Sequence, residues 1–297
     1  MDPSHSVPGR VSEWLLWGQG RLADLENPSM ESRALMGALL GSPTAPWTRW
    51  SEQLPETLSE TFREWVERRA KREPFQYIVG TVPFFGRIFR VGPGVLVPRP
   101  ETEHLVALAL DHLRERRRKE PPRILDLGAG SGAIIMSLLL EWPDAVGVAV
   151  EREADAIRTL AENRDGFGLE GRLSILRGSW GEMLSKTPSF DLILSNPPYI
   201  PSGVIGTLDP EVRDHEPRPA LDGGPDGLSC YREILAFAPA ILNEGGLLAF
   251  EIGADQAWAF QPGGAALDGL PSGFDGSFTV LKDIAGRDRI VTLTGNK

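Results

Sequence analysis

The 297-residue sequence contains little that could crosslink the chain, bind a metal or cross a membrane. Its single cysteine, Cys230, cannot form a disulfide within the chain, and its four histidines give no Cys/His spacing of a zinc site. No stretch approaches the ~20 apolar residues of a membrane span, and the first ten residues lack the basic start and apolar core of an export signal. We therefore expect a cytoplasmic, soluble protein with no metal centre.

Basic residues are also few. The chain has 31 Lys and Arg against 41 Asp and Glu, a net charge of −10, and nearly all of this charge falls on residues 121–297. A protein that acts mainly by neutralising nucleic-acid phosphates needs many Lys and Arg contacts, so this class is disfavoured. The length and the hydrophobic content of 41% favour an ordinary globular domain joined to a smaller one.

Hydrophobic residues near the N-terminus recur at helical spacing. An apolar cluster spans residues 34–40, and four further residues share one helix face: Leu58, Phe62, Trp65 and Val66. These patterns predict a helical domain over residues 1–74. The composition then changes to Phe, Tyr, Val and Ile with glycines at the turns, which predicts a linker over residues 75–98, formed by a short β-hairpin or an extended connector.

A further helix is expected from about Glu101 to Arg118. Its last turn begins the cationic run Arg114 to Lys119, which could bind a partner; we interpret it as a solvated helix end, because cations there oppose the helix dipole. Glu101 and Glu103 are interpreted as charges that complement the other end of this helix, in preference to substrate contacts. Arg99, just before it, is expected to face the active site.

From residue 121 onward the sequence alternates strands with helices. Strands are expected at residues 124–125, 146–150, 173–176, 190–195, 247–251, 278–281 and 289–293. This alternation implies an α/β fold with a mostly parallel sheet and helices on both faces. Ligands of such sheets bind outside the carboxyl ends of the strands, where a long loop over residues 196–227 is expected to receive the substrate.

A glycine-rich turn, Asp126-Leu127-Gly128-Ala129-Gly130-Ser131-Gly132, closes the first of these strands. Glycines permit a tight turn and let a ligand approach the backbone. The spacing lacks the final G-x-x-G step of a dinucleotide site and resembles the S-adenosylmethionine turn of class I methyltransferases. Glu151 ends the next strand, where it could bind ribose hydroxyls or be merely solvated. Trp180 follows the third strand, where it could pack on adenine or belong to the core.

The segment Asn196-Pro197-Pro198-Tyr199 follows the fourth strand. A planar nitrogen is a poor nucleophile because its lone pair is delocalised, so it must be aimed in line with the sulfonium methyl. The Asn196 side-chain oxygen and a neighbouring backbone carbonyl, spread by rigid prolines, can accept the two N–H hydrogens of such a group. Tyr199 can lie against its plane. We predict that all four residues bind the substrate and position it for catalysis.

Several further segments, taken with these motifs, resemble one known family. They are Pro98-Arg99-Pro100-Glu101-Thr102-Glu103, Phe75-Gln76-Tyr77-Ile78 with Gly80, Glu216-Pro217 leading to Ala220-Leu221-Asp222-Gly223-Gly224, Asp226-Gly227-Leu228, and Glu251-Ile252-Gly253. The sequence resembles the HemK/PrmC protein-(glutamine-N5) methyltransferases, which modify peptide chain release factors. The resemblance covers the chain from about Phe75 to its end, and more weakly the N-terminal helices.

The resemblance implies a class I S-adenosylmethionine-dependent methyltransferase: a Rossmann-like, seven-stranded, mostly parallel sheet over residues 99–297, with an N-terminal helical bundle that recognises the substrate and a β-hairpin linker. Its reaction moves a methyl group from S-adenosylmethionine to the side-chain N5 of the glutamine in the Gly-Gly-Gln loop of release factors, leaving S-adenosylhomocysteine. No direct nucleic-acid target and no membrane are implied. The implied cofactor-binding residues are Asp126, Gly128, Ala129, Gly130, Ser131, Gly132, Glu151, Trp180 and Asn196, and Arg99 joins the substrate-binding set.

Two departures and two alternatives accompany this interpretation. Ser179 stands where the family commonly has Asp, and Glu151 replaces the more usual Asp. Adenine-N6 methyltransferases of DNA or RNA share the Asn-Pro-Pro-Tyr segment, but they predict a target-recognition region rich in Lys and Arg. A non-catalytic cofactor-binding protein has no need for that segment. His215, in the long loop, is interpreted as a surface residue because a methylated nitrogen can lose its proton to water.

Overall fold

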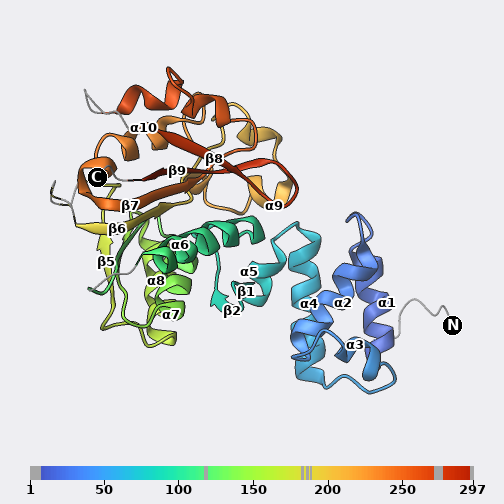
Figure 1. Cartoon of the computed structure of the whole chain (residues 1–297). Coiled ribbons are helices and arrows are strands. Elements are labelled where there is room, and N and C mark those ends of the chain that lie inside the picture. Colours follow the sequence, from blue (N-terminus) through green and yellow to red (C-terminus); the bar gives the residue numbers. More distant parts are fainter. Residues whose placement is uncertain are drawn as a thin grey trace. The chain divides into compact units, whose positions relative to one another are not determined.

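The computed structural model describes residues 8–116, 120–181, 184, 187, 189–270 and 277–294. Contacts divide the chain into a helical unit, Met1–Gly80 with Pro210–His215, and a sheet unit, Thr81–Asp209 with Glu216–Lys297 (Figure 1). The chain thus leaves the sheet unit for a short segment and then returns to it. In the described ranges, no helix is long and apolar enough to cross a membrane.

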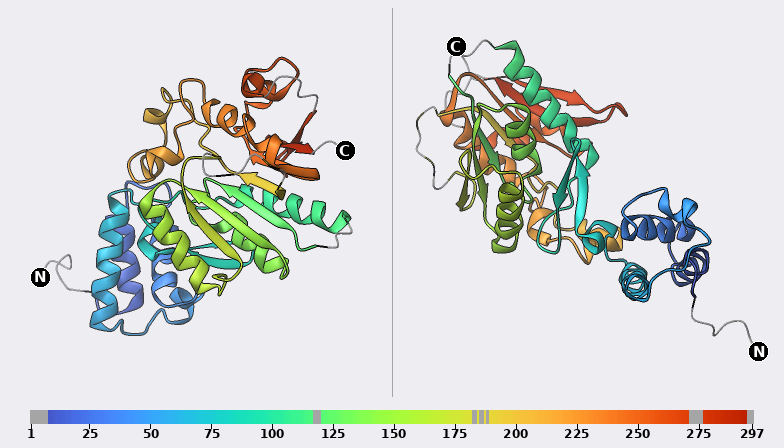
Figure 2. Two further views of the ribbon diagram at one scale, coloured as in Figure 1. Left: turned by 90° about the vertical axis from the view of Figure 1, so that its left-hand side faces the viewer. Right: turned by 90° about the horizontal axis from the view of Figure 1, so that it is seen from below.

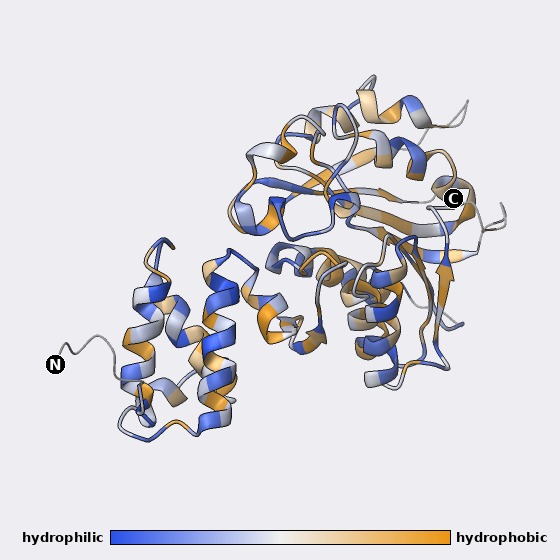
Figure 3. Ribbon diagram, turned by 180° about the vertical axis from the view of Figure 1, so that it is seen from behind, coloured by the Kyte–Doolittle hydropathy of each residue, from blue (hydrophilic) through white to orange (hydrophobic). Residues whose placement is uncertain are grey.

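The helical unit packs its helices around a small apolar core. They are α1 (Val11–Arg21), α2 (Pro28–Leu39), α3 (Ala45–Thr48), α4 (Glu56–Ala70), α5 (Phe75–Val79) and α9 (Pro210–Arg213). The predicted apolar face of α4 is confirmed, because Phe62 and Val66 are fully buried together with Trp14 of α1. In Figure 3 hydrophilic and hydrophobic colours alternate along these helices, as expected for helices with one buried face.

The first residues expected in the hairpin linker form a helix instead. Helix α5 spans Phe75–Val79 and ends at Gly80, whose φ of +80° is a left-handed conformation that favours glycine and commonly terminates helices. Tyr77 and Ile78 are buried, so their strand-like residue types reflect packing. A short hairpin follows: β1 (Thr81–Phe84) pairs antiparallel with β2 (Arg87–Arg90).

Ion pairs hold the segment 210–215 within the helical unit. The buried Arg69 guanidinium lies 2.9 Å from Glu31 Oε1 and 3.0 Å from Glu211 Oε1, and Arg72 Nη2 lies 2.8 Å from Glu211 Oε2. His215 is half-buried there, with Nε2 3.2 Å from a backbone carbonyl that follows α4. Such charge-assisted contacts fix both position and orientation of the segment.

The sheet unit is built on seven strands in the order β5-β4-β3-β6-β7-β9-β8. Their bounds are β3 (Arg123–Leu127), β4 (Val146–Glu151), β5 (Leu173–Arg177), β6 (Phe190–Ser195), β7 (Leu242–Glu251), β8 (Phe278–Lys282) and β9 (Asp288–Thr294). Neighbours from β5 to β7 are parallel, and β9 is antiparallel to β7 and β8. In Figure 2 the strands can be found by colour: β3 to β5 are green to yellow-green, β6 is yellow, β7 is orange, and β8 and β9 are red. The predicted seven-stranded, mostly parallel sheet is confirmed.

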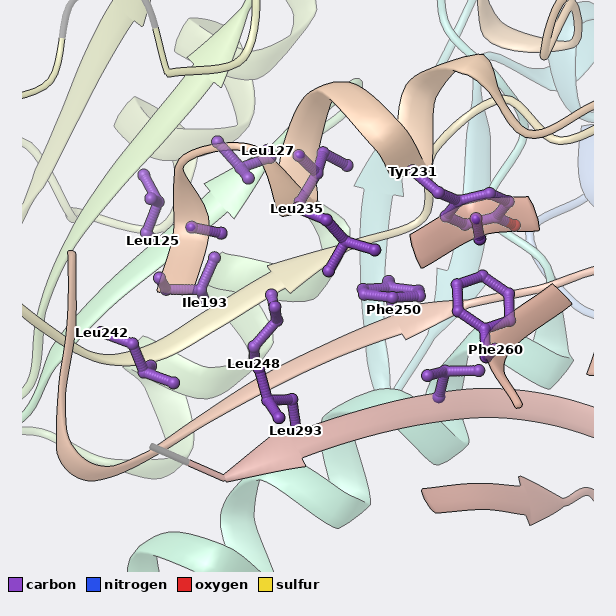
Figure 4. Packing of buried hydrophobic residues seen from close by; sticks show 14 of the residues in the cluster. Leu125, Leu127, Ile193, Tyr231, Leu235, Leu242, Leu248, Phe250, Phe260 and Leu293 are labelled. Carbon is purple, nitrogen blue, oxygen red and sulfur yellow. The ribbon is translucent and has the colours of Figure 1, made fainter. Parts of the chain in front are cut away.

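Helices cover both faces of this sheet. They are η2 (Pro100–Thr102), α6 (Glu103–Glu115), α7 (Ala133–Glu141), α8 (Ala154–Gly166), α10 (Ser229–Leu235), α11 (Ala238–Ile241), η5 (Ala257–Phe260) and η6 (Ala265–Gly269). In Figure 1, α6, α7 and α8 lie along one face and α10 along the other. Figure 4 shows Tyr231 and Leu235 of α10 packed with Ile193, Leu248 and Phe250 of the strands, all fully buried.

The helix expected over residues 101–118 begins with the 3-10 turn η2 and ends at Glu115 in the described residues. Of the predicted cationic run, Arg114 pairs with Asp111 at 2.9 Å, and Arg116 donates to the Glu244 carbonyl at 3.4 Å. Residues 117–119 of that run lie outside the described residues.

The long loop over residues 196–227 contains more structure than expected. It forms η3 (Ile205–Thr207), α9 and η4 (Arg218–Ala220). Pro210 begins α9, as suits the first helical position. Asp222 closes the loop on itself, because its Oδ1 accepts from Ser202 Oγ at 2.5 Å and from the Gly224 backbone N–H at 3.0 Å. The loop is therefore shaped by internal hydrogen bonds.

Candidate active site

The carboxyl ends of three neighbouring strands meet at the middle of the sheet. Strand β3 lies between β4 and β6, and Leu127 at its end is level with Val150 of β4 and Ser195 of β6. Beyond these residues the chain enters the glycine-rich turn, Glu151 and Asn196. This is the topological switch point, where strand order reverses and open α/β sheets bind ligands.

Backbone hydrogen bonds attach the glycine-rich turn to β4. The N–H groups of Gly128 and Ala129 both donate to the Val150 carbonyl, at 2.9 and 3.1 Å. Gly130 has φ +55°, and a Cβ there would meet nothing within 4 Å, whereas one on Gly132 would lie 2.4 Å from a methyl of a buried leucine. Gly130 therefore leaves room for a ligand, and Gly132 permits close helix packing.

Glu151 closes the same turn with its side chain. Its Oε2 accepts the Gly130 N–H at 2.9 Å, and its Oε1 accepts the N–H groups of Arg152 and Glu153 at 2.6 and 2.9 Å. A carboxylate offers about four acceptor positions, so roughly one, on Oε2, remains for a ligand. The side chain is therefore held rigidly while it keeps acceptor capacity toward the turn.

Asp126 lies beneath the turn and is fully buried. Neither of its carboxylate oxygens makes a hydrogen bond of good geometry in the described part of the chain. Burial raises the pKa of Asp126 to about 7; the Ile135 backbone N–H opposes this rise, and the charge of Glu151 adds to it. A buried carboxyl group with so little hydrogen bonding is costly, and such groups are concentrated at functional sites.

Trp180 follows β5, the third predicted strand, and lies over the glycine-rich turn. A Cβ placed on Gly128 would be 3.5 Å from the Trp180 ring, in ordinary van der Waals contact, so the ring lies directly beside the turn. Trp180 has φ +45°, an unusual conformation for a residue other than glycine. It also packs against the sheet core, and Ser179 lines the cavity beside it.

Asn196 lies at the end of β6, and Thr102 contacts its side chain. The Asn196 Nδ2 donates to Thr102 Oγ1 at 3.2 Å, and Thr102 Oγ1 donates to Glu251 Oε2 at 2.6 Å. The hydroxyl of Ser195, immediately before it, donates to the Leu127 carbonyl at 2.7 Å and ties the end of β6 to β3. Thr102 thus connects the Asn196 amide to Glu251, although the three residues are far apart in the sequence.

Tyr199 is held from the opposite side of the segment by Gln256. The Gln256 Nε2 donates to the carbonyls of Tyr199 and Gly227 at 3.0 and 3.1 Å, and its Oε1 accepts the Gly253 N–H at 2.9 Å. Burial, and then the charge of Glu251, raise the pKa of the Tyr199 hydroxyl, which keeps it neutral. The Asn-Pro-Pro-Tyr segment is therefore anchored at both ends.

Arg99 pairs with a buried carboxylate of the long loop. Its Nη2 lies 2.5 Å from Glu216 Oε2, and the other Glu216 oxygen accepts the Val97 N–H at 3.3 Å. Burial raises the pKa of Glu216, and the Arg99 charge and the Val97 N–H oppose this rise. In this structure Arg99 holds the loop where it re-enters the sheet unit.

These elements enclose a cavity of about 670 Å³, within the size range of small-molecule sites. Of the predicted site residues, eight line it: Gly128, Ala129, Gly130, Ser131, Glu151, Trp180, Asn196 and Pro198. Five others are adjacent in sequence or structure but are outside its lining as described: Arg99, Asp126, Gly132, Pro197 and Tyr199. In the described ranges, no group of three or more His, Cys, Asp and Glu side chains could hold a metal ion.

The sequence patterns assigned no role to Thr102, Glu251 or Gln256. Thr102 and Glu251 occur in segments that carry the family resemblance, yet neither pattern indicates that they touch. Glu251 is 2% exposed at the end of β7, two strands from β3, so its contact with Thr102 depends on the sheet order. Only the assembled fold reveals this network.

Comparisons with known proteins place this chain in a family. The model of the PrmC N-terminal domain matches residues 13–80, and that of the methyltransferase small domain matches residues 103–205. The chain is 39% identical to the release factor glutamine methyltransferase of Caulobacter vibrioides, covering 91% of this chain and 90% of that protein. It is 40% identical to the enzyme of the same name from Agrobacterium fabrum, over 95% and 96% of the two chains.

Among solved structures, the precorrin-6y C5,15-methyltransferase of Geobacter metallireducens is similar at 14% identity and a TM-score of 0.45, with 70% of this chain and 94% of that chain covered. The two sequence relatives are each about 40% identical and are matched over nine tenths or more of both chains. The chain therefore belongs to the release factor glutamine methyltransferase family.

Proposed function

We propose that the protein transfers a methyl group from S-adenosylmethionine to the side-chain N5 of the glutamine in the Gly-Gly-Gln loop of peptide chain release factors. The observation that carries this proposal is that the glycine-rich turn and the Asn196 amide line a single cavity at the switch point of the sheet. The glycine-rich turn suits an adenosyl ligand, and the Asn196 amide suits a planar amide substrate. Membership of the family supplies the substrate class.

The residues around the turn fit the cofactor. Gly128 and Gly130 leave space that a Cβ would fill, Glu151 keeps acceptor capacity for a ribose hydroxyl, and Trp180 offers a flat apolar surface to adenine. Asp126 completes the proposed cofactor-binding set from beneath the turn, where it is fully buried and outside the cavity lining. When bound, S-adenosylmethionine supplies an electrophilic methyl group, and S-adenosylhomocysteine leaves as product.

The Asn-Pro-Pro-Tyr segment orients the acceptor in this proposal. Asn196 Oδ1 accepts one N–H of the glutamine amide, and a backbone carbonyl of the segment accepts the other. The carbonyl of Tyr199 already accepts from Gln256, and that of Ile200 from Gly223, so residues 196–198 are the source of the second acceptor. Holding both hydrogens aims the nitrogen lone pair at the methyl group. After transfer the nitrogen loses one proton to water.

The parts of the chain divide the work of recognition and catalysis. Residues 1–74 recognise the body of the release factor, residues 75–98 link them to the catalytic domain, and residues 99–297 form that domain, with Arg99 on its substrate side. The charge of −11 over residues 121–297 disfavours a nucleic-acid target. Because release factors act on ribosomes, the protein works in the cytoplasm.

A labelling experiment tests the proposed function. The protein is incubated with methyl-labelled S-adenosylmethionine and a purified release factor, either native or with the Gly-Gly-Gln glutamine changed to Ala. We expect label on the native factor only, at the glutamine, by mass spectrometry. Duplex DNA and ribosomal RNA serve as further acceptors. Equal labelling of both release factors, or labelling of nucleic acid in their place, contradicts the proposal.

A further inference from the structure

The side chain of Asn196 needs a fixed orientation to serve as an acceptor. An amide presents its oxygen on one side and its NH2 on the other, and a turn of 180° exchanges an acceptor for two donors. With NH2 toward the substrate, Asn196 would oppose the N–H groups of a glutamine amide. Something must therefore hold the oxygen toward the cavity.

Thr102 is the neighbouring residue that can fix the orientation of the Asn196 amide. Its hydroxyl has one hydrogen, and the short contact of 2.6 Å to Glu251 Oε2 commits that hydrogen to a carboxylate. Toward Asn196 the hydroxyl oxygen can then act only as an acceptor, so it must face the Nδ2 group, at 3.2 Å. The Asn196 Oδ1, on the other side of the planar amide, is left for the cavity that Asn196 and Thr102 both line.

Glu251 is itself fixed from several directions. It is 2% exposed, its Oε1 lies 4.0 Å from Arg289 Nη1, and its backbone carbonyl accepts the Tyr231 hydroxyl at 2.9 Å. A buried carboxylate so restrained cannot turn away from Thr102 without losing its hydrogen bond. The hydrogen-bond direction therefore runs from Asn196 through Thr102 to Glu251.

We propose that Thr102 and Glu251 are positioning residues that set the polarity of the Asn196 amide and so hold its oxygen toward the acceptor. This role rests on the proposed function, because only an N–H-bearing acceptor requires the oxygen there. Neither residue touches the reacting atoms. Both act on turnover through Asn196 and leave the glycine-rich turn unchanged.

The test compares Thr102→Val, which removes the hydroxyl at nearly constant shape, with Thr102→Ser, which keeps it. We expect Thr102→Val to lower kcat roughly 10- to 100-fold at saturating cofactor and release factor, because small misplacements of a positioning group are costly. Thr102→Ser, which keeps the hydroxyl, should retain most of the wild-type kcat. The cofactor Kd, measured by calorimetry, stays within about threefold in both variants, since the turn is intact.

Coupling distinguishes positioning from a structural role. We expect Glu251→Gln to lower kcat severalfold in the wild-type background, because its amide no longer fixes the direction of the Thr102 hydrogen. In combination with Thr102→Val it has no further effect, since both changes act through one hydrogen-bonded path. Additive losses, or a wild-type kcat in Thr102→Val, overturn the positioning role. If Thr102→Val shows no cooperative thermal transition, an unchanged kcat in Glu251→Gln overturns the role equally.

Wild-type protein is the control that separates this inference from the proposed function. Labelling of the native release factor, with none on the Gln→Ala factor, supports the proposed function before any variant is compared. Absence of that labelling overturns the proposed function, and the positioning role falls with it. Wild-type labelling with additive variants overturns the positioning role alone.

Discussion

The cavity has two ends that are built differently. The turn end, made of Gly128–Ser131 and Glu151, uses backbone groups and one carboxylate from two adjacent strands. The amide end is made of Asn196 and Thr102, which line the cavity, and of the buried Glu251, which Thr102 contacts. Asn196 and Thr102 are 94 residues apart in the sequence, and Thr102 and Glu251 are 149 apart. The first end depends on a local motif, and the second depends on the order of strands in the sheet.

This difference has consequences for how each end tolerates change. At the turn end several backbone contacts contribute to the proposed cofactor site, so one altered side chain weakens cofactor binding without abolishing it. At the amide end one side-chain oxygen, Asn196 Oδ1, acts beside a backbone carbonyl as the proposed acceptor, and the direction of this oxygen depends on one hydroxyl. Substitutions at the amide end should therefore affect turnover, and those at the turn end should affect cofactor affinity.

Asn196→Ala should have the largest effect and would separate the two ends most clearly. It removes the proposed acceptor oxygen, and loss of one such positioned polar group costs on the order of 10²- to 10³-fold in kcat. The cofactor Kd should change little, because the turn and Glu151 remain. Single-turnover transfer rates and calorimetric cofactor binding measure the two quantities. Activity that survives this substitution would contradict the proposed role of the Asn196 oxygen.

The same contrast explains what sequence patterns could predict. The glycine-rich turn, Glu151 and the alternating strands were predicted because each follows from local spacing, and the seven-stranded fold is confirmed. Helix α5 was not predicted, because Tyr77 and Ile78 have strand-like residue types that packing overrides. The bends of the long loop were missed as well, because Asp222 and its partners lie about twenty residues apart or less in no regular pattern.

The network at the amide end could not have been predicted by the same means. Glu251 reaches Thr102 because β7 lies beside β6, and because η2 precedes a helix that packs against β7. No periodicity in the sequence encodes that proximity. The roles assigned to the individual site residues stay predictions, and the variants described here are the means to test them.

Glu151→Gln should give the next largest effect, and it sharpens the comparison from the turn end. Gln has one acceptor oxygen in place of two, so the backbone N–H groups and a ribose hydroxyl compete for it. Hydrogen bonds to a charged group contribute about 1.5–3 kcal/mol, which corresponds to a cofactor Kd raised roughly 10- to 100-fold. The kcat at saturating cofactor should be nearly unchanged. Glu151→Asp is the matched control, because it keeps both oxygens and should raise Kd by less than about tenfold.

Asp126→Asn should have the smallest effect, and its sign depends on pH. The pKa of Asp126 is raised by burial to about 7, above the ordinary value of 3.8, so between those values the folded protein holds a proton that the unfolded chain has released. Wild-type stability relative to the variant is therefore greatest below pH 4 and falls as pH rises through 7.

The neutral amide avoids the cost of burying a charge, but it brings polar atoms that also lack partners, so the net gain above pH 7 should be only about 1 kcal/mol. Thermal unfolding of the cofactor-free proteins at pH 5, 6, 7 and 8 measures it. A stability difference that is constant over this range would mean that Asp126 is ionised throughout, with partners that the buried geometry does not provide. The turn end would then carry a compensated charge, and its contrast with the hydrogen-bonded amide end would be weaker.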